Sequence, residues 1–131
     1  MLLDTNAWIW WEFKPDLIPP KIQTELAAVE ASSGLFVSVV SVWEIATKVA
    51  LGKLELPVTA REWVAATSNN PALTILPLTP DVALESADLP PPFHRDPADR
   101  LIVALARRRR ATLVTADRKI LDYPHVKSLW A

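Results

Sequence analysis

Four acidic residues, far apart in the sequence, have the side-chain type and the local setting that could bind a metal ion. Asp4 and Asp117 each follow directly after a short apolar run that predicts a strand. Glu44 and Asp99 each fall in the first turn of a predicted helix. If the four carboxylates lie together, they repel one another unless a cation holds them in place. The pattern therefore predicts a divalent metal site.

The ligand chemistry of such a cluster favours Mg²⁺ or Mn²⁺. Carboxylate and water oxygens suit these ions, and the sequence has no cysteine and no paired histidine motif of the kind that holds zinc. One such ion, or two about 3.5–4 Å apart, lowers the pKa of a bound water and neutralises charge on a leaving oxygen. The acids therefore predict hydrolysis of phosphodiester bonds, with no nucleophile supplied by the protein.

The elements that must position these acids alternate between short strands and helices. Strands are predicted over residues 2–3, 35–39, 72–76, 112–115 and 126–129. Helices are predicted over 7–13, 20–31, 42–51, 80–88, 97–109 and 118–121, with one more from 59 onward. This alternation is typical of a short parallel sheet covered by helices on both faces, a three-layer α/β/α fold. Since ligands gather at the carboxyl ends of parallel strands, the four acids are expected at one edge of the sheet.

Two acids at the start of the helix 97–109 are predicted to have different roles. Asp96 has the position of an N-cap, and Pro97 that of the first helical residue. Asp99 lies on the same side of the helix as Ile102 and Val103, so its carboxylate is expected to face inward. We expect Asp96 to cap the helix and Asp99 to bind the metal. Taken singly, each acid also fits an ordinary place at a strand end, cap or turn.

Four motifs occur in the order that they have in a known family. They are Leu2-Leu3-Asp4-Thr5-Asn6, Ser41-Val42-Trp43-Glu44, His94-Arg95-Asp96-Pro97-Ala98-Asp99-Arg100 and Thr115-Ala116-Asp117. Together they resemble the PIN-domain ribonucleases, specifically the VapC-type toxins, over nearly the whole chain. The resemblance implies a PIN-like fold and a metal-dependent endoribonuclease, with Asp4, Glu44, Asp99 and Asp117 as its catalytic and metal-binding acids.

The same resemblance implies helper residues and partners. Polar support for the acids is expected from Thr5, Asn6, Asp96 and Thr115. A homodimer is expected, together with a small cognate antitoxin whose tail enters the site. Ala98 stands where the family has a bulky aromatic residue, a difference expected to affect packing more than chemistry.

Basic residues near the acids are candidates for contacts with the RNA backbone. Arg95, Arg100, Lys48 and Lys53 are close to the acids in sequence. The denser run 107–110 ends a helix, where cations suit the negative end of the helix dipole, so its role is expected to be structural. His94 has two interpretations, a contact to phosphate or proton shuttle and a structural residue before the cap.

The six tryptophans leave two alternatives open. Trp8, Trp10 and Trp11 crowd one short helix, so part of this aromatic surface is expected either at a dimer or antitoxin interface or in an unusually aromatic core. Stacking of an RNA base on an exposed tryptophan is a third interpretation.

Length and composition set the remaining bounds. A chain of 131 residues, half of them apolar, is expected to form a single domain over 1–131. Only two glycines are present, which excludes glycine-rich phosphate loops. No apolar stretch predicts a membrane span or signal peptide, and no cysteine is present, so a cytoplasmic protein is expected.

Two functions from different classes fit these features. The first is a Mg²⁺- or Mn²⁺-dependent endoribonuclease that acts on RNA as the toxin of a toxin–antitoxin pair. The second is a catalytically silent PIN-like module that binds RNA or protein. The intact acidic set favours the enzyme, because a binding module has no use for four mutually repelling carboxylates.

Overall fold

A five-stranded parallel sheet forms the centre of the computed structural model, which describes residues 1–131. The strands are β1 (Leu2–Leu3), β2 (Leu35–Ser38), β3 (Leu73–Leu76), β4 (Leu113–Val114) and β5 (Ser128–Leu129). They lie in the order β3-β2-β1-β4-β5, and every neighbouring pair is parallel. The sequence prediction of a short central parallel sheet is confirmed.

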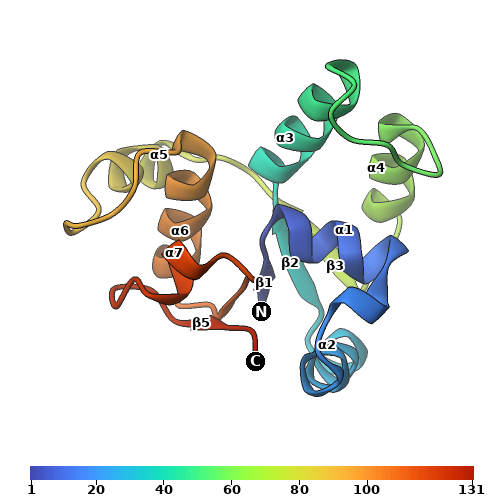
Figure 1. The fold of residues 1–131 in the computed structure, drawn as a ribbon, viewed down its shortest axis with the longest axis horizontal. Coiled ribbons are helices and arrows are strands. Elements are labelled where there is room, and N and C mark those ends of the chain that lie inside the picture. Colours follow the sequence, from blue (N-terminus) through green and yellow to red (C-terminus); the bar gives the residue numbers. More distant parts are fainter.

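Helices fill the connections between the strands. They are α1 (Thr5–Phe13), α2 (Pro20–Ser32), α3 (Val39–Ala50), α4 (Ala60–Ser68), α5 (Pro80–Ala87), α6 (Pro97–Arg109) and α7 (Arg118–Leu121), with a 3-10 turn η1 (Pro15–Leu17). Figure 1 shows α5, α6 and α7 on one side of the sheet and α1 and α2 on the other. The three-layer α/β/α arrangement predicted from the sequence is therefore present. None of the helices combines the length and the apolar character that crossing a membrane requires.

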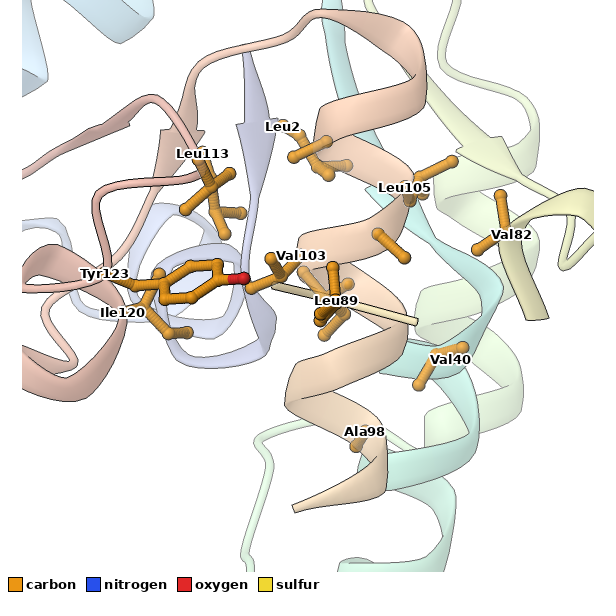
Figure 2. Packing of buried hydrophobic residues seen from close by; sticks show 14 of the residues in the cluster. Leu2, Val40, Val82, Leu89, Ala98, Val103, Leu105, Leu113, Ile120 and Tyr123 are labelled. Atoms are coloured by element: carbon orange, nitrogen blue, oxygen red, sulfur yellow. The ribbon is translucent and has the colours of Figure 1, made fainter. Parts of the chain in front are cut away.

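Two hydrophobic cores lie on opposite faces of the sheet, because successive strand residues point to opposite sides. Leu2 and Leu113 pack with α6, whose apolar face runs from Ile102 to Ala106 (Figure 2). Their neighbours Leu3 and Val114 pack on the other face with α1, α2 and the buried Trp63 of α4. Strands β1 and β4 thus each contribute one side chain to each core, which fixes the positions of the residues that follow them.

Two helix starts differ from the sequence prediction. Helix α1 begins at Thr5 because Asp4 itself is the N-cap, and its side chain accepts a hydrogen bond from the Ala7 N–H at 2.8 Å. Helix α3 begins at Val39 with Ser38 as its N-cap, several residues before the predicted start. Glu44 is therefore in the second turn of α3, and the predicted place in the first turn was wrong.

Two of the three tryptophans of α1 pack against other aromatic side chains of the same chain, and the third forms a hydrogen bond to α2. Trp8 is fully buried with its ring centroid 4.3 Å from that of Trp63. The ring centroids of Trp10 and Trp130 are 5.6 Å apart. The Trp11 Nε1–H donates a hydrogen bond to the Glu30 carboxylate. The structure thus supports the aromatic-core alternative for α1. The most exposed tryptophan is Trp43 on α3, at 61% exposure.

The basic run at the end of α6 is used to attach α5. Arg107 Nε lies 3.2 Å from a Glu85 carboxylate oxygen, and Arg108 lies 3.3 Å from Asp81. The Arg109 guanidinium lies over the ring of Phe36, with its central carbon 4.8 Å from the ring centroid. These contacts support the structural role expected for the run at Arg107, Arg108 and Arg109.

Candidate active site

The order of strands places the site at the carboxyl ends of β1 and β4. The chain runs from β1 outward through β2 to β3, and then returns to build β4 and β5 on the other side of β1. Such a reversal leaves a crevice between the two central strands, where α/β proteins bind ligands. Asp4 follows β1 directly and Asp117 comes three residues after β4, so both lie at this crevice.

Thr5 connects the first turn of α1 to α3. Its hydroxyl donates to Glu44 Oε1 at 2.6 Å and lies 2.8 Å from the hydroxyl of Ser41, which is fully buried. Glu44 also forms an ion pair with Lys48, one turn further along α3, at 3.7 Å. These contacts hold the Glu44 carboxylate on the side of α3 that faces Asp4.

The first turn of α6 carries the other two acids of the motif. Asp96 is the N-cap, and its side chain accepts a hydrogen bond from the Asp99 N–H at 3.0 Å, as predicted from the sequence. Asp99 is half-buried and lies on the helix face shared with the buried residues Ile102 and Val103. The inward orientation predicted for Asp99 is confirmed.

Thr115 and Asp117 complete the arrangement after β4. Thr115 is fully buried, and its hydroxyl accepts from the Asp117 N–H at 3.0 Å. The same side chain lowers the pKa of Asp4, so it lies near that carboxylate as well. Asp117 is in turn the N-cap of α7 and accepts from the Lys119 N–H. Thr115 therefore connects the acids that follow β1 and β4.

A cleft of about 410 Å³ collects all of these acids. Its walls are Asp4, Thr5, Asn6, Trp10, Glu44, Lys48, Asp96, Asp99, Ala116 and Asp117. Each of the four predicted metal-binding acids lines the cleft, and so do Thr5, Asn6 and Asp96 among the predicted supporting residues. The lining has one cation against five carboxylates, so the cleft attracts positive charge.

The carboxylates of the cleft hold protons more tightly than isolated ones. Burial first, and then the charges of Asp117 and Glu44, raise the pKa of Asp4 to about 6, against the lowering effects of the Thr115 side chain and of the hydrogen bond from the Ala7 N–H. Burial first, and then the charge of Asp96, raise the pKa of Asp99 to about 7. Both shifts have the physical origin expected of several carboxylates that share one partly dry pocket.

The donor set fits a hard divalent cation. Carboxylate oxygens from four segments surround one cleft, where burial and the neighbouring negative charges raise the pKa values of Asp4 and Asp99. Ligand atoms of His94, Asp99 and Asp117 lie within 4.8 Å of one another. A cation held here would bind phosphate oxygens on its open side.

The predicted RNA-contact residues are placed differently from one another. Lys48 lines the cleft, whereas Arg95, Arg100 and Lys53 do not. Arg95 and Lys53 are exposed. The Arg100 guanidinium donates to the backbone carbonyls of Ser86 and His94, so it fastens the segment before α6. Contact between these residues and RNA stays a prediction.

Three residues of the site had no clear signal in the sequence. Ser41 orients Thr5 through its buried hydroxyl, and Trp10 forms the aromatic wall of the cleft. His94 has its Nε2 atom 3.3 Å from Asp99 Oδ2. From the sequence, the role of His94 stayed open between a contact to phosphate or proton shuttle and a structural residue before the Asp96 cap.

Comparison with known proteins places the chain among relatives of one kind. The family model described as "PIN domain" matches residues 1–126. The chain is 30% identical over 125 residues to Ribonuclease VapC22 of Mycobacterium tuberculosis, covering 95% of this chain and 92% of that protein.

Solved structures share the fold at lower identity. A VapBC2 structure from Rickettsia felis, bound to a DNA fragment from the promoter, aligns with a TM-score of 0.71 and 17% identity over 100% of both chains. FitAcB from Neisseria gonorrhoeae aligns with a TM-score of 0.65 and 23% identity, covering 98% of this chain and 95% of that chain. These likenesses confirm the fold over the full length of the chain.

Proposed function

Since this chain belongs to the PIN-domain family, we propose that it is a ribonuclease of the VapC type, the toxin of a toxin–antitoxin pair, which hydrolyses RNA with Mg²⁺ or Mn²⁺. The observation that carries the proposal is the cleft in which Asp4, Glu44, Asp99 and Asp117 meet. The relative named as a ribonuclease, 30% identical over 95% of this chain, supports the same activity.

The cation would be held by four carboxylates of the cleft, those of Asp4, Glu44, Asp99 and Asp117. When bound, a divalent cation supplies Lewis-acid chemistry, neutralising phosphate charge and lowering the pKa of water. Water then adds its oxygen to the phosphorus atom, the bond to one ribose oxygen breaks, and the proton released by water balances the one taken up by that leaving oxygen. The chain needs no nucleophile of its own for this reaction.

The remaining polar residues of the cleft have supporting roles. Thr5 holds the carboxylate of Glu44 in position through a hydrogen bond, and the Ala7 N–H does the same for Asp4. Lys48 is the cation in the wall of the cleft and can bind a phosphate of the RNA backbone. Asp96 acts on the site by starting α6, which places Asp99.

Cleavage assays with the purified protein test this function. Structured and single-stranded RNAs are incubated with Mg²⁺, with Mn²⁺ and with EDTA, and we expect cleavage in the presence of either metal only. Asp99→Asn should abolish it, and Asp88→Asn, at an exposed site outside the cleft, should not. Cleavage that survives EDTA would refute the mechanism. RNA that is bound but never cut by the wild type would favour the silent binding module.

An antitoxin is the proposed partner. The neighbouring structures are complexes of toxin and antitoxin, which supports a comparable partner here. An apolar groove between α3 and α4, lined by Val42, Val49 and Val64 among others, offers a surface for it. Expression in a bacterial host should arrest growth, and co-expression with the product of an adjacent small reading frame should restore it. Growth arrest by the Asp99→Asn variant would show that toxicity does not come from this cleft.

A further inference from the structure

His94 lies directly behind the carboxylates of the cleft. It precedes α6 by three residues, and its Nε2 atom is 3.3 Å from Asp99 Oδ2. One ligand atom from each of His94, Asp99 and Asp117 lies within 4.8 Å of the other two. These three side chains come from two segments, the start of α6 and the residues after β4.

The Nε2 atom of His94 is buried and has no hydrogen-bond partner. Asp99 Oδ2 is near, but the two atoms are not aligned as a hydrogen bond. A buried ring nitrogen without a partner is uncommon, because removal from water costs free energy that a partner must repay. The structure thus leaves one nitrogen donor unused beside two carboxylates.

The spacing of His94 Nε2 and Asp99 Oδ2 is close to that of two ligands on one ion. Two adjacent ligands of an octahedral cation, at the 2.0–2.1 Å bond length typical of Mg²⁺, lie about 3 Å apart. The separation of 3.3 Å between His94 Nε2 and Asp99 Oδ2 is close to this value. Only small side-chain movements are needed for both to reach a common ion.

Neighbouring residues hold the imidazole ring in this place. The ring of Phe93 packs edge-on against it with centroids 4.5 Å apart, and Phe93 stacks in turn on the buried Tyr123. The Tyr123 hydroxyl donates to the Pro90 carbonyl, and Arg100 donates to the carbonyl of His94 itself. The histidine is therefore fixed before any ligand arrives, which lowers the entropy cost of binding.

We propose that His94 Nε2 is a ligand of the divalent cation, together with Asp99 and Asp117, and that this nitrogen makes the site select Mn²⁺ over Mg²⁺. The proposal rests on the cation of the proposed function. Imidazole nitrogen suits transition-metal ions, whereas Mg²⁺ prefers oxygen ligands and keeps its waters.

Electron paramagnetic resonance of the Mn²⁺-loaded protein tests the proposal directly. A bound imidazole nitrogen couples to the Mn²⁺ electron spin, and electron spin-echo modulation detects the coupling. The sequence has two histidines, His94 and His125, so the source of the signal can be assigned. We expect a nitrogen signal in the wild type that persists in His125→Asn and disappears in His94→Asn. Absence of the signal from the wild type would overturn the proposal without recourse to any variant.

Metal affinities provide the second readout. Titration calorimetry should give a Mn²⁺ affinity about 10-fold or more weaker in His94→Asn, the size of effect seen when even an outer partner of a metal ligand is lost. The Mg²⁺ affinity should change much less, because a water oxygen can replace the nitrogen as a ligand of Mg²⁺ with little loss of affinity. Equal losses for both metals would refute the proposal and show that His94 only positions Asp99. His94→Gln serves in place of His94→Asn if thermal melting shows that the asparagine variant is unfolded.

These measurements separate the inference from the proposed function. Mn²⁺ bound with a nitrogen signal in a protein that cuts no RNA would support the ligand role of His94 and refute the nuclease. Cleavage of RNA by a protein whose bound Mn²⁺ gives no nitrogen signal would support the nuclease and refute the ligand role of His94.

Discussion

At the scale of single residues, the two acids that start α6 show how position determines role. Asp96 accepts the hydrogen bond of the Asp99 N–H, and Asp99 presents its own carboxylate to the cleft. Asp96 also lines the cleft, and its charge contributes to the raised pKa of Asp99. The two acids are thus coupled through charge but perform separate tasks.

Asp96→Ser and Asp99→Asn should separate these tasks. Serine also caps helices well, so Asp96→Ser should keep the fold and change the cleavage rate by less than about 10-fold. Asp99→Asn should keep the fold but lower the cleavage rate by more than about 100-fold, beyond the effect of losing an outer partner of a ligand. Initial cleavage rates and circular dichroism check both variants. An Asp96→Ser protein that is folded but as inactive as Asp99→Asn would place both acids in the metal site.

The raised pKa values of Asp4 and Asp99 predict how stability without metal depends on pH. Both carboxyl groups bind protons more tightly in the folded than in the unfolded protein. Between the unfolded pKa of 3.8 and the folded pKa values of about 6 and about 7, the folded state therefore carries more protons than the unfolded state. Their contribution to the free energy of unfolding is fully present below the unfolded pKa, and it is lost as the pH rises through the folded pKa values. In EDTA, the Tm should therefore fall by several degrees from about pH 5.5 to about pH 8.

Asp99→Asn provides the control for this pH dependence. The amide does not titrate, so the variant should lose part of the slope, while Asp88→Asn should keep all of it. Mn²⁺ added near pH 8 should raise the Tm of the wild type, since it binds only the folded cleft. A Tm that rises with pH in EDTA would contradict the raised pKa values.

At the scale of the elements, α1 and α3 are connected at the site by a small buried hydrogen-bond network. Thr5 is 6% exposed and Ser41 is fully buried, and their hydroxyls lie 2.8 Å apart. The network connects the start of one helix to the second turn of another. It therefore controls where Glu44 lies relative to Asp4.

Thr5→Val should test this connection. Valine has nearly the same shape but no hydroxyl, so Glu44 and the buried Ser41 each lose a partner, at a cost of about 1–3 kcal/mol in the free energy of unfolding. The cleavage rate should fall as well, because Glu44 loses its orientation. Urea unfolding measures the stability, with Thr24→Val on α2 as the matched control, which should stay within about 0.5 kcal/mol of wild type. A Thr5→Val protein as stable and active as wild type would show that the network does not position Glu44.

The alternation of elements and the acids that follow the strands could be predicted from the sequence, because both depend on local patterns. Apolar runs, prolines and the Asp96 cap leave clear local signals. The start of α3 was predicted too late, because Val39 and Val40 are typical strand residues and only the buried Ser38 cap begins the helix there. The place of His94 could not be predicted, because it depends on aromatic packing of Phe93 against Tyr123, thirty residues further along the chain.

At the scale of the whole molecule, an open surface between α3 and α4 is strongly apolar. Valines and alanines of both helices form an open groove there, and the exposed Trp43 also lies on α3. Contiguous apolar surface of this kind commonly marks an interaction site. The groove shares α3 with the acidic cleft, so a bound partner could cover both.

Val49→Glu should separate partner binding from catalysis. A charge in the groove must lose water on binding, so the affinity for the antitoxin proposed above should fall by about 10-fold or more. RNA cleavage by the free protein should stay at the wild-type level, because Val49 does not line the cleft. Surface plasmon resonance measures the affinity, and Ala83→Glu on the exposed side of α5 is the control. Unchanged affinity in Val49→Glu would place the partner elsewhere on the molecule.

The central position of β1 has a consequence for synthesis of the protein. Leu2 and Leu3 pair with Leu113 and Val114, 111 residues later in the sequence. Asp4 therefore cannot meet Asp117 until the long segment between them has been made and folded. A nascent chain that stops before β4 lacks one side of the crevice, so the acidic cleft forms only after β4 has left the ribosome.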